Sequence, residues 1–177
     1  MFTNIDYLMN GNEKQRQAYR AIKSLRIMED LSDYSPILCG TIPINIHVET
    51  SDLDVIMEAC DLEQFEQQLV RLYRHHQDFV LKRRTIRNKP VIKANFKYEG
   101  FEFELFAQAQ PSDRQNAYLH MIIENHILEK TPSLRMEIIN MKKQGLKTEP
   151  AFCKVLGLEG DPFESLIEYG KEQGIIE

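Results

Sequence analysis

The stretch LCGTIPINIHVETSDLDVI, residues 38–56, contains two apolar runs separated by a polar loop, and the second run carries Asp52 and Asp54. Alternate residues of a β-strand point to opposite faces of the sheet. Both carboxylates should therefore lie on one face, while Leu53 and Val55 point into the core. Two such carboxylates repel each other, and they are stable side by side when a cation lies between them.

A carboxylate pair of this kind suits a hard divalent cation. Mg²⁺ (or Mn²⁺) prefers oxygen ligands and often shares its coordination between one or two protein carboxylates and substrate phosphates. The alternative interpretation is that Asp52 and Asp54 form the solvated end of a strand and bind nothing. The residues around the pair help to decide between the two.

Composition limits the classes of protein to consider. With 177 residues, 42% of them hydrophobic, we expect one domain over residues 1–177. No apolar run approaches the roughly 18 residues that a membrane span needs, and the N-terminus lacks the order of a secretory signal, so we expect a cytoplasmic protein without a membrane partner. The net charge of −5 argues against a general nucleic-acid binder. Widely spaced cysteines, odd in number, predict buried free thiols at Cys39, Cys60 and Cys153.

The first part of the chain predicts a mixture of helices and strands. An amphipathic pattern predicts a helix over residues 13–31, with Asn12 and Gln15 as a capping pair. The segments SPILCG and SDLDVIME predict two strands joined by a loop that contains Pro43. A second helix should begin after the N-cap Asp61, and its inner side should carry Leu62, Phe65, Leu69 and Leu72.

The second part predicts a meander followed by helices. The alternating runs FVLKRRTI, VIKANFKY and FEFELFA, divided by RNKP and by a turn at Gly100, predict three antiparallel strands. We expect an α/β core of the α+β type over about residues 1–110, with a mixed β-sheet and N-terminal helices, and a helical C-terminal part over about residues 111–177. The later helices should begin or end at the N-caps Asp113, Thr131 and Asp161 and at the C-terminal glycines Gly145 and Gly157.

The order of residues around the aspartates resembles a known signature. Gly40 and Thr41 follow an apolar strand, ten residues intervene, and Asp52-Leu53-Asp54-Val55 comes next. This order resembles the nucleotidyltransferase superfamily of the polymerase-beta type. The glycine of that signature allows backbone amides to approach phosphate, the hydroxyl donates to a phosphate oxygen, and the aspartates hold metal.

Over its whole length the sequence also resembles a bacterial family described only as a domain of unknown function, number 4269. The stretches that carry this likeness are GTIPI, SDLDVI, GFEFELF, QNAYLHM and GLKTEPAF. The resemblance implies a nucleotidyltransferase-like core followed by helices, and it identifies no acceptor.

The superfamily resemblance implies a third carboxylate on a later strand, for which FEFELF offers Glu102 and Glu104. Glu104 is our choice, because Glu102 adjoins the turn at Gly100, whereas Glu104 lies deeper in the strand. The implied reaction transfers a nucleoside monophosphate from a nucleoside triphosphate to an acceptor hydroxyl, with two metal ions about 3.5–4 Å apart. The implied metal ligands are Asp52, Asp54, Glu104 and Glu102, and the implied phosphate contacts are Gly40 and Thr41.

A basic stretch runs through the predicted meander of an otherwise acidic protein. It could neutralise a triphosphate, with Lys93 as the candidate contact, or receive RNA. The alternative is that its lysines protect an edge strand from pairing with other sheets. Alternation places Lys93 and Lys97 on the face of the glutamates, where opposite charges would meet. The members of the stretch are Lys82, Arg83, Arg84, Arg87, Lys89, Lys93 and Lys97.

Other polar groups carry weaker signals. His120 and His126 lack helical metal-site spacing and receive no role. Two further groups of polar residues have candidate roles. The first group contacts substrate or caps a helix, and comprises Arg114, Gln115, Asn116 and Tyr118; the second organises a turn, and comprises Lys147, Thr148 and Glu149.

Three functions remain open from the sequence. The first is an active nucleotidyltransferase, the second a degenerate nucleotide-binding protein of the same fold, and the third a nucleic-acid or protein interaction module that uses the hairpin at residues 82–97. The acceptor could be a small metabolite, an antibiotic-like alcohol, RNA or a protein side chain.

Overall fold

The computed structural model describes residues 2–177 and contains a five-stranded mixed β-sheet of order β1-β2-β5-β4-β3. Strand β2 pairs with β5 in parallel, and the other neighbouring strands are antiparallel. This arrangement agrees with the predicted α+β fold class. The strands are β1 (Ile37–Cys39), β2 (Leu53–Glu58), β3 (Gln77–Ile86), β4 (Lys89–Tyr98) and β5 (Phe101–Gln108).

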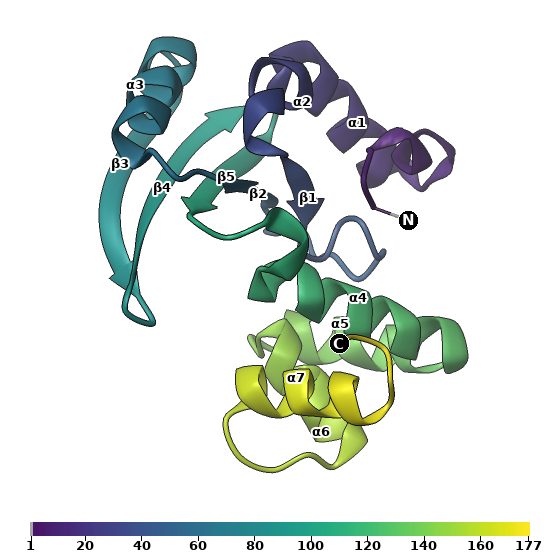
Figure 1. The fold of residues 1–177 in the computed structure, drawn as a ribbon. Coiled ribbons are helices and arrows are strands. Elements are labelled where there is room, and N and C mark those ends of the chain that lie inside the picture. Colours follow the sequence, from purple (N-terminus) through teal and green to yellow (C-terminus); the bar gives the residue numbers. More distant parts are fainter. Residues whose placement is uncertain (1) are drawn as a thin grey trace.

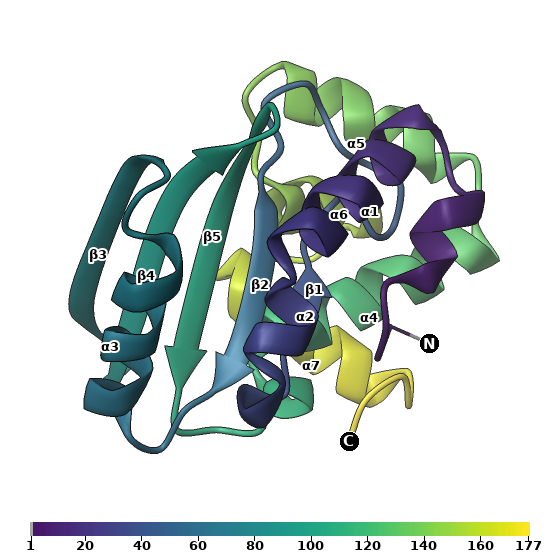
Figure 2. The same ribbon diagram turned by 90° about the horizontal axis from the view of Figure 1, so that it is seen from above.

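Helices cover both faces of the sheet. The N-terminal helices and α3 pack on one face, and the C-terminal helices pack on the other, mainly against β1 and β2 (Figures 1 and 2). Leu53, Val55 and Phe103 point to the first face and are fully buried. The second face carries the polar residues of β2 and β5, so the candidate site lies between the sheet and the C-terminal helices. The first-face helices are α1 (Glu13–Leu25), α2 (Ile27–Asp30) and α3 (Leu62–Tyr73).

Helix α1 begins as predicted but ends early. The Asn12 side chain accepts a hydrogen bond from the Gln15 amide, and the Gln15 side chain accepts one from the Asn12 amide, at 3.0 Å each. The single helix expected over residues 13–31 was wrong, because Arg26 adopts a left-handed conformation that ends α1 and begins the short helix α2. Apolar periodicity continues across such a break, which explains the error.

The predicted meander is confirmed. Strands β3, β4 and β5 form consecutive antiparallel pairs, and the turn between β4 and β5 has positive φ at Glu99 and Gly100. The turn at the tip of the β3–β4 hairpin also has positive φ, at Arg87 and Asn88. Strand β3 lies at the edge of the sheet, and Arg83 forms an ion pair with Glu66 of α3.

The C-terminal part is helical, as expected, and comprises α4 (Asn116–Lys130), α5 (Leu134–Lys143), α6 (Thr148–Leu156) and α7 (Pro162–Glu172). Asp161 caps α7 as predicted, and Gly157 ends α6 in a left-handed conformation. Two predicted N-caps are wrong: Asp113 lies in a 3₁₀ turn before α4, and Thr131 ends α4.

The structure also corrects one cysteine. Cys39 and Cys153 are buried free thiols, whereas Cys60 is exposed. No helix among residues 2–177 is long and apolar enough to cross a membrane.

The loop after β1 is held from two sides. Within it, the Ile46 amide donates to the Thr41 carbonyl oxygen at 3.0 Å. The Gln15 side chain donates to the carbonyl oxygens of Ile42 and Pro43 at 2.9 and 3.2 Å. Arg135 of α5 donates to the two carbonyl oxygens that follow. These bonds fix the segment that directly follows Gly40.

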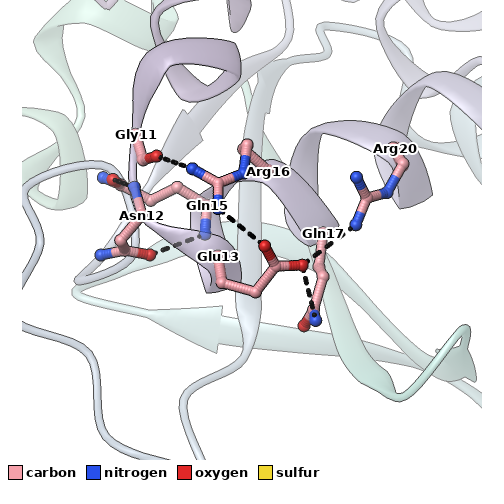
Figure 3. A network of polar contacts seen from close by, with 7 residues as sticks. All are labelled: Gly11, Asn12, Glu13, Gln15, Arg16, Gln17 and Arg20. Carbon is pink, nitrogen blue, oxygen red and sulfur yellow. Dashed lines mark hydrogen bonds and ion pairs between the residues drawn. The ribbon is translucent and has the colours of Figure 1, made fainter.

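Figure 3 shows the polar contacts at the start of α1, around Gln15. Gln15 and Asn12 form the capping box, while Arg16 and Arg20 both approach Glu13, with nitrogen to oxygen distances of 2.7 and 3.3 Å. The ion pairs are exposed and contribute little to stability. Gln15 is buried, and its removal would leave the Pro43 carbonyl oxygen without its donor and the Asn12 amide without its acceptor, whereas the Ile42 carbonyl oxygen would keep the Asn45 amide.

We expect Gln15→Ala to lower the free energy of unfolding by about 1–3 kcal/mol, the usual cost of leaving buried hydrogen-bonding groups unsatisfied. Urea denaturation measures this change. Gln17→Ala, two residues further along α1 and exposed, is the matched control and should change stability by less than about 0.5 kcal/mol. Equal losses in the two variants would contradict the anchoring role of Gln15.

Candidate functional site

Three carboxylates converge on the second face of the sheet. Asp52, Asp54 and Glu104 each offer an oxygen, and these oxygens all lie within 4.8 Å of one another. They form the only group of three or more potential ligands of this kind among residues 2–177. We call Asp52, Asp54 and Glu104 the carboxylate triad.

The pairing of β2 with β5 brings the triad together. In this parallel pair Asp54 is the direct partner of Glu104. Asp52 precedes β2 by one residue and lies on the same face as Asp54, as the alternation of side chains predicts. The apolar neighbours Leu53 and Leu105 are fully buried on the opposite face, which fixes the direction of both strands' polar residues.

Gly40 approaches this group closely. It has a φ of +81°, and a Cβ atom at this position would lie 2.5 Å from Oδ2 of Asp54. Any larger residue would therefore be strained and would collide with the aspartate. The next residue, Thr41, contacts the Ser51 hydroxyl at an oxygen to oxygen distance of 3.1 Å. This contact joins the two ends of the loop that connects β1 to Asp52.

The two candidate third carboxylates have different environments. Glu104 is partly buried, and its Oε2 lies 2.6 Å from Nζ of Lys93. Glu102 is exposed and lies outside the triad. Lys97 is the direct cross-strand partner of Glu102 but forms its ion pair with Asp78, at 2.8 Å. The expected meeting of opposite charges on this face therefore occurs at Lys93 and Glu104.

Burial makes the triad electrostatically unfavourable without a cation. Desolvation, followed by the charges of Asp52 and Glu104, raises the pKa of Asp54 to about 8. Desolvation also raises the pKa of Asp52, with Glu104 and Glu102 adding to the effect. The Lys93 ammonium opposes both shifts and only partly compensates for them. A cation held by the triad would favour the charged forms.

The triad lines a cavity of about 880 Å³ between the sheet and the C-terminal helices. Such a volume lies in the upper part of the range of ligand pockets, roughly 300–1,000 Å³. Gly40 and Thr41 line it together with the triad, whereas Lys93 and Glu102 are not among its lining residues in the described part of the chain. From the basic stretch, Arg87 and Lys89 at the hairpin tip line the cavity.

The opposite wall contains residues that the sequence did not predict as functional. His120 and Glu124 lie one helical turn apart on α4, and both are buried. Lys142 of α5 also lines the cavity, and burial lowers the pKa of its ammonium to about 8. A signal was present in the sequence, because a buried histidine and glutamate four residues apart on an apolar helix are unusual. Lys147, Thr148 and Glu149, expected only to form a turn, line the same wall.

Two of the residues at the start of α4 also reach the cavity. Gln115 and Asn116 line it, and the buried Gln115 side chain donates to the carbonyl oxygens of Met57 and Gln110 at 2.8 and 2.9 Å. Gln115 therefore joins α4 to the sheet. Gln115 is the N-cap residue of α4, but its side chain makes no capping hydrogen bond, so the helix capping expected in this region is absent at Gln115.

Comparison with solved structures finds the same fold. A cytoplasmic RNA terminal U-transferase is 16% identical, with a TM-score of 0.53 over 80% of this chain and 45% of that one. The Cid1 poly(U) polymerase with MgGTP bound is 15% identical, with a TM-score of 0.52 over 74% of this chain and 42% of that one. A chain of the GLD-2/RNP-8 complex is 14% identical, with a TM-score of 0.54 over 88% of this chain and 63% of that one.

These neighbours are polymerase-beta-type nucleotidyltransferases, so the chain has a nucleotidyltransferase-like fold. It spans less than half of the length of the first two. No curated protein matches the sequence. The family model described as a domain of unknown function, DUF4269, matches residues 20–169, and the chain belongs to that family.

Proposed function

We propose that the protein is a metal-dependent nucleotidyltransferase that transfers a nucleoside monophosphate from a nucleoside triphosphate to an acceptor hydroxyl. The observation that carries the proposal is the convergence of Asp52, Asp54 and Glu104 within 4.8 Å of one another beside Gly40 and Thr41. Oxygen ligands in this number and spacing suit Mg²⁺ or Mn²⁺. The raised pKa of Asp54 supports the same ions, since its cause is burial beside like charges that Lys93 compensates only in part.

Each member of the site has a role in this proposal. Asp52, Asp54 and Glu104 would hold the metal, which when bound lowers the pKa of the attacking hydroxyl and stabilises the leaving pyrophosphate. Gly40 leaves room for phosphate beside Asp54, because it has no side chain to fill that space. Thr41 presents a hydroxyl that can donate to a phosphate oxygen. The ion pair of Lys93 with Glu104 holds the third carboxylate in place.

The basic hairpin supports this function more than a separate interaction module. Arg87 and Lys89 line the same cavity as the triad, so their charges are available to a polyphosphate there. The neighbours add support, because they include an RNA terminal U-transferase and a poly(U) polymerase with MgGTP bound. At 14–16% identity this likeness gives the fold, and the activity of this chain rests on its own residues.

The metal-free protein should lose stability as pH rises. The pKa of Asp54 is about 8 in the folded state against an ordinary value of 3.8, so between these values the folded state binds more protons than the unfolded state. Its contribution to the free energy of unfolding therefore falls across this window. Denaturation of the wild type and of Asp54→Asn at pH 5 to 8 measures it. The advantage of the wild type over the variant should shrink with pH.

Asp33→Asn, at an exposed position, is the control for the pH dependence of Asp54→Asn. A difference between wild type and Asp54→Asn that stays constant from pH 5 to 8 would contradict the raised pKa. Magnesium should restore stability to the wild type at pH 8 and should have little effect on the variant.

Binding of nucleotide should depend on metal and on both aspartates. A ligand that binds only the folded state at 100 times its Kd raises stability by about 2.7 kcal/mol, which thermal unfolding detects. We expect magnesium with a nucleoside triphosphate to give such a shift, and the double variant Asp52→Asn, Asp54→Asn to lose most of it while remaining folded. Glu58→Gln, at the other end of β2, is the matched control. Full metal-dependent nucleotide affinity in the double variant would refute the site assignment.

Glu104 and Glu102 should respond differently to the same substitution. They lie on one face of β5, but only Glu104 belongs to the triad. Since even partners outside the coordination shell are worth about 10–100-fold in metal affinity, Glu104→Gln should weaken Mn²⁺ binding at least tenfold. Glu102→Gln should change it little. Titration calorimetry with Mn²⁺ compares them, and equal, negligible effects would leave a site of two aspartates.

A further inference from the structure

The cavity extends beyond the triad to a second group of ionisable side chains. We call Glu124 of α4, Glu149 of α6 and His120 of α4 the helical wall, because all three line the cavity from the C-terminal helices. The site described above uses none of them. They are also joined to the site by charge, since Glu149 contributes to the raised pKa of Asp54.

Glu124 is the least satisfied member of the wall. Its residue is 3% exposed, and its Oε1 is buried without a hydrogen-bond partner among the described residues. A buried carboxylate oxygen without a donor costs roughly 1–3 kcal/mol, and more when it is charged. Burial and the nearby Glu149 raise its pKa well above the usual value, although the Lys142 ammonium opposes the shift. A donor brought by a ligand would remove this cost.

His120 and Glu149 form the adjoining part of the wall. The His120 Nε2 lies 2.8 Å from the Phe163 carbonyl oxygen, which can only accept, so Nε2 carries the proton. Its Nδ1 lies 3.6 Å from Glu149 Oε1, beyond a normal hydrogen bond. When the imidazole is neutral with its proton on Nε2, His120 Nδ1 and Glu149 Oε1 are both hydrogen-bond acceptors. A ligand with several N–H donors suits this pair as well as Glu124.

The spacing favours an organic cation over a metal ion. The three members of the wall do not bring ligand atoms within 4.8 Å of one another, unlike the triad. Lys142 lines the same cavity, yet neither it nor Glu124 forms an ion pair among the described residues. The single ammonium group of Lys142 faces Glu124, Glu149, Asp52 and Asp54, so the chain neutralises the carboxylates of the cavity only in part. An ammonium group, with donors pointing in several directions, meets that requirement.

We propose that the helical wall binds an ammonium group of the acceptor, so that the acceptor is a small hydroxylated amine such as an amino sugar or aminocyclitol. This inference rests on the proposed function for the transfer itself. There the acceptor hydroxyl oxygen bonds to the α-phosphorus, the bond from that phosphorus to pyrophosphate breaks with its electrons leaving on pyrophosphate, and the hydroxyl proton passes to a triad carboxylate. The ammonium group remains on the wall and orients the hydroxyl.

Charge argues against a nucleic-acid acceptor in this part of the cavity. Phosphodiesters would face Glu124 and Glu149 in addition to the triad, and binding of a polyanion requires basic residues. Of the basic residues that line the cavity, Arg87 and Lys89 belong to β3–β4 on the sheet side, and Lys142 and Lys147 lie on the helical side, where Lys142 already faces the carboxylates of the cavity. An RNA acceptor is consequently an outcome that the experiment must detect.

The test compares amines with neutral isosteres in the absence of metal and nucleotide. Glucosamine is paired with glucose, and streptamine with scyllo-inositol, so each pair differs only in amino groups replaced by hydroxyls. Calorimetry or ligand-observed NMR measures binding to the full chain. At least one amine should bind, and its neutral isostere should bind at least tenfold more weakly, the difference expected for charged hydrogen bonds.

Variants then assign the binding to the wall. Glu124→Gln and Glu149→Gln should each weaken amine binding tenfold or more, and both variants should still be stabilised by magnesium and triphosphate. Glu129→Gln, on an exposed position of α4, is the matched control and should bind like the wild type. Because glutamine retains the shape of glutamate without its charge, Glu124→Gln should unfold at the same temperature as the wild type or higher.

Three results would overturn the inference. One is that neither amine binds, or that amines and neutral isosteres bind alike. Another is that amine binding survives both wall substitutions. The third is that a single-stranded RNA oligonucleotide binds while the amines do not. Stabilisation by magnesium and triphosphate, measured alongside, separates these failures from failure of the proposed function, which would abolish that stabilisation as well.

Discussion

The parallel pairing of β2 with β5 is the constraint on which the rest of the structure depends. It places Asp54 directly beside Glu104, two residues that are 50 positions apart in the sequence. Parallel neighbours need a long crossover connection. Here that connection is α3 with the β3–β4 hairpin, and it returns the chain to β2 as strand β5. The same crossover carries Arg87 and Lys89 to the edge of the cavity.

The site concentrates unfavourable features that the surrounding structure supports. Like charges meet at the triad, and Gly40 adopts a positive φ against Asp54. Buried apolar neighbours hold both strands in register, while Gln15 and Arg135 fix the loop after Gly40 from opposite sides. A binding site for metal and polyphosphate requires such preorganisation, because the ligands must be in place before the substrate arrives.

Local patterns were enough to predict much of this arrangement. Alternation gave the meander and the faces of Asp54 and Glu104, and cap chemistry gave the starts of α1 and α7. The break at Arg26 was missed because periodicity continues across it. The helical wall was missed for another reason: Glu149 of α6 comes beside His120 and Glu124 of α4 only when the C-terminal helices pack together, and separation along the chain hides such contacts.

The most direct test of the account is a crystal structure with Mn²⁺ and a non-hydrolysable nucleoside triphosphate, using anomalous scattering to locate manganese. We expect manganese between Asp52, Asp54 and Glu104, with the triphosphate against Gly40 and Thr41. Manganese bound elsewhere, or a triphosphate that contacts none of these residues, would contradict the claim that the β2–β5 pair builds a metal and nucleotide site.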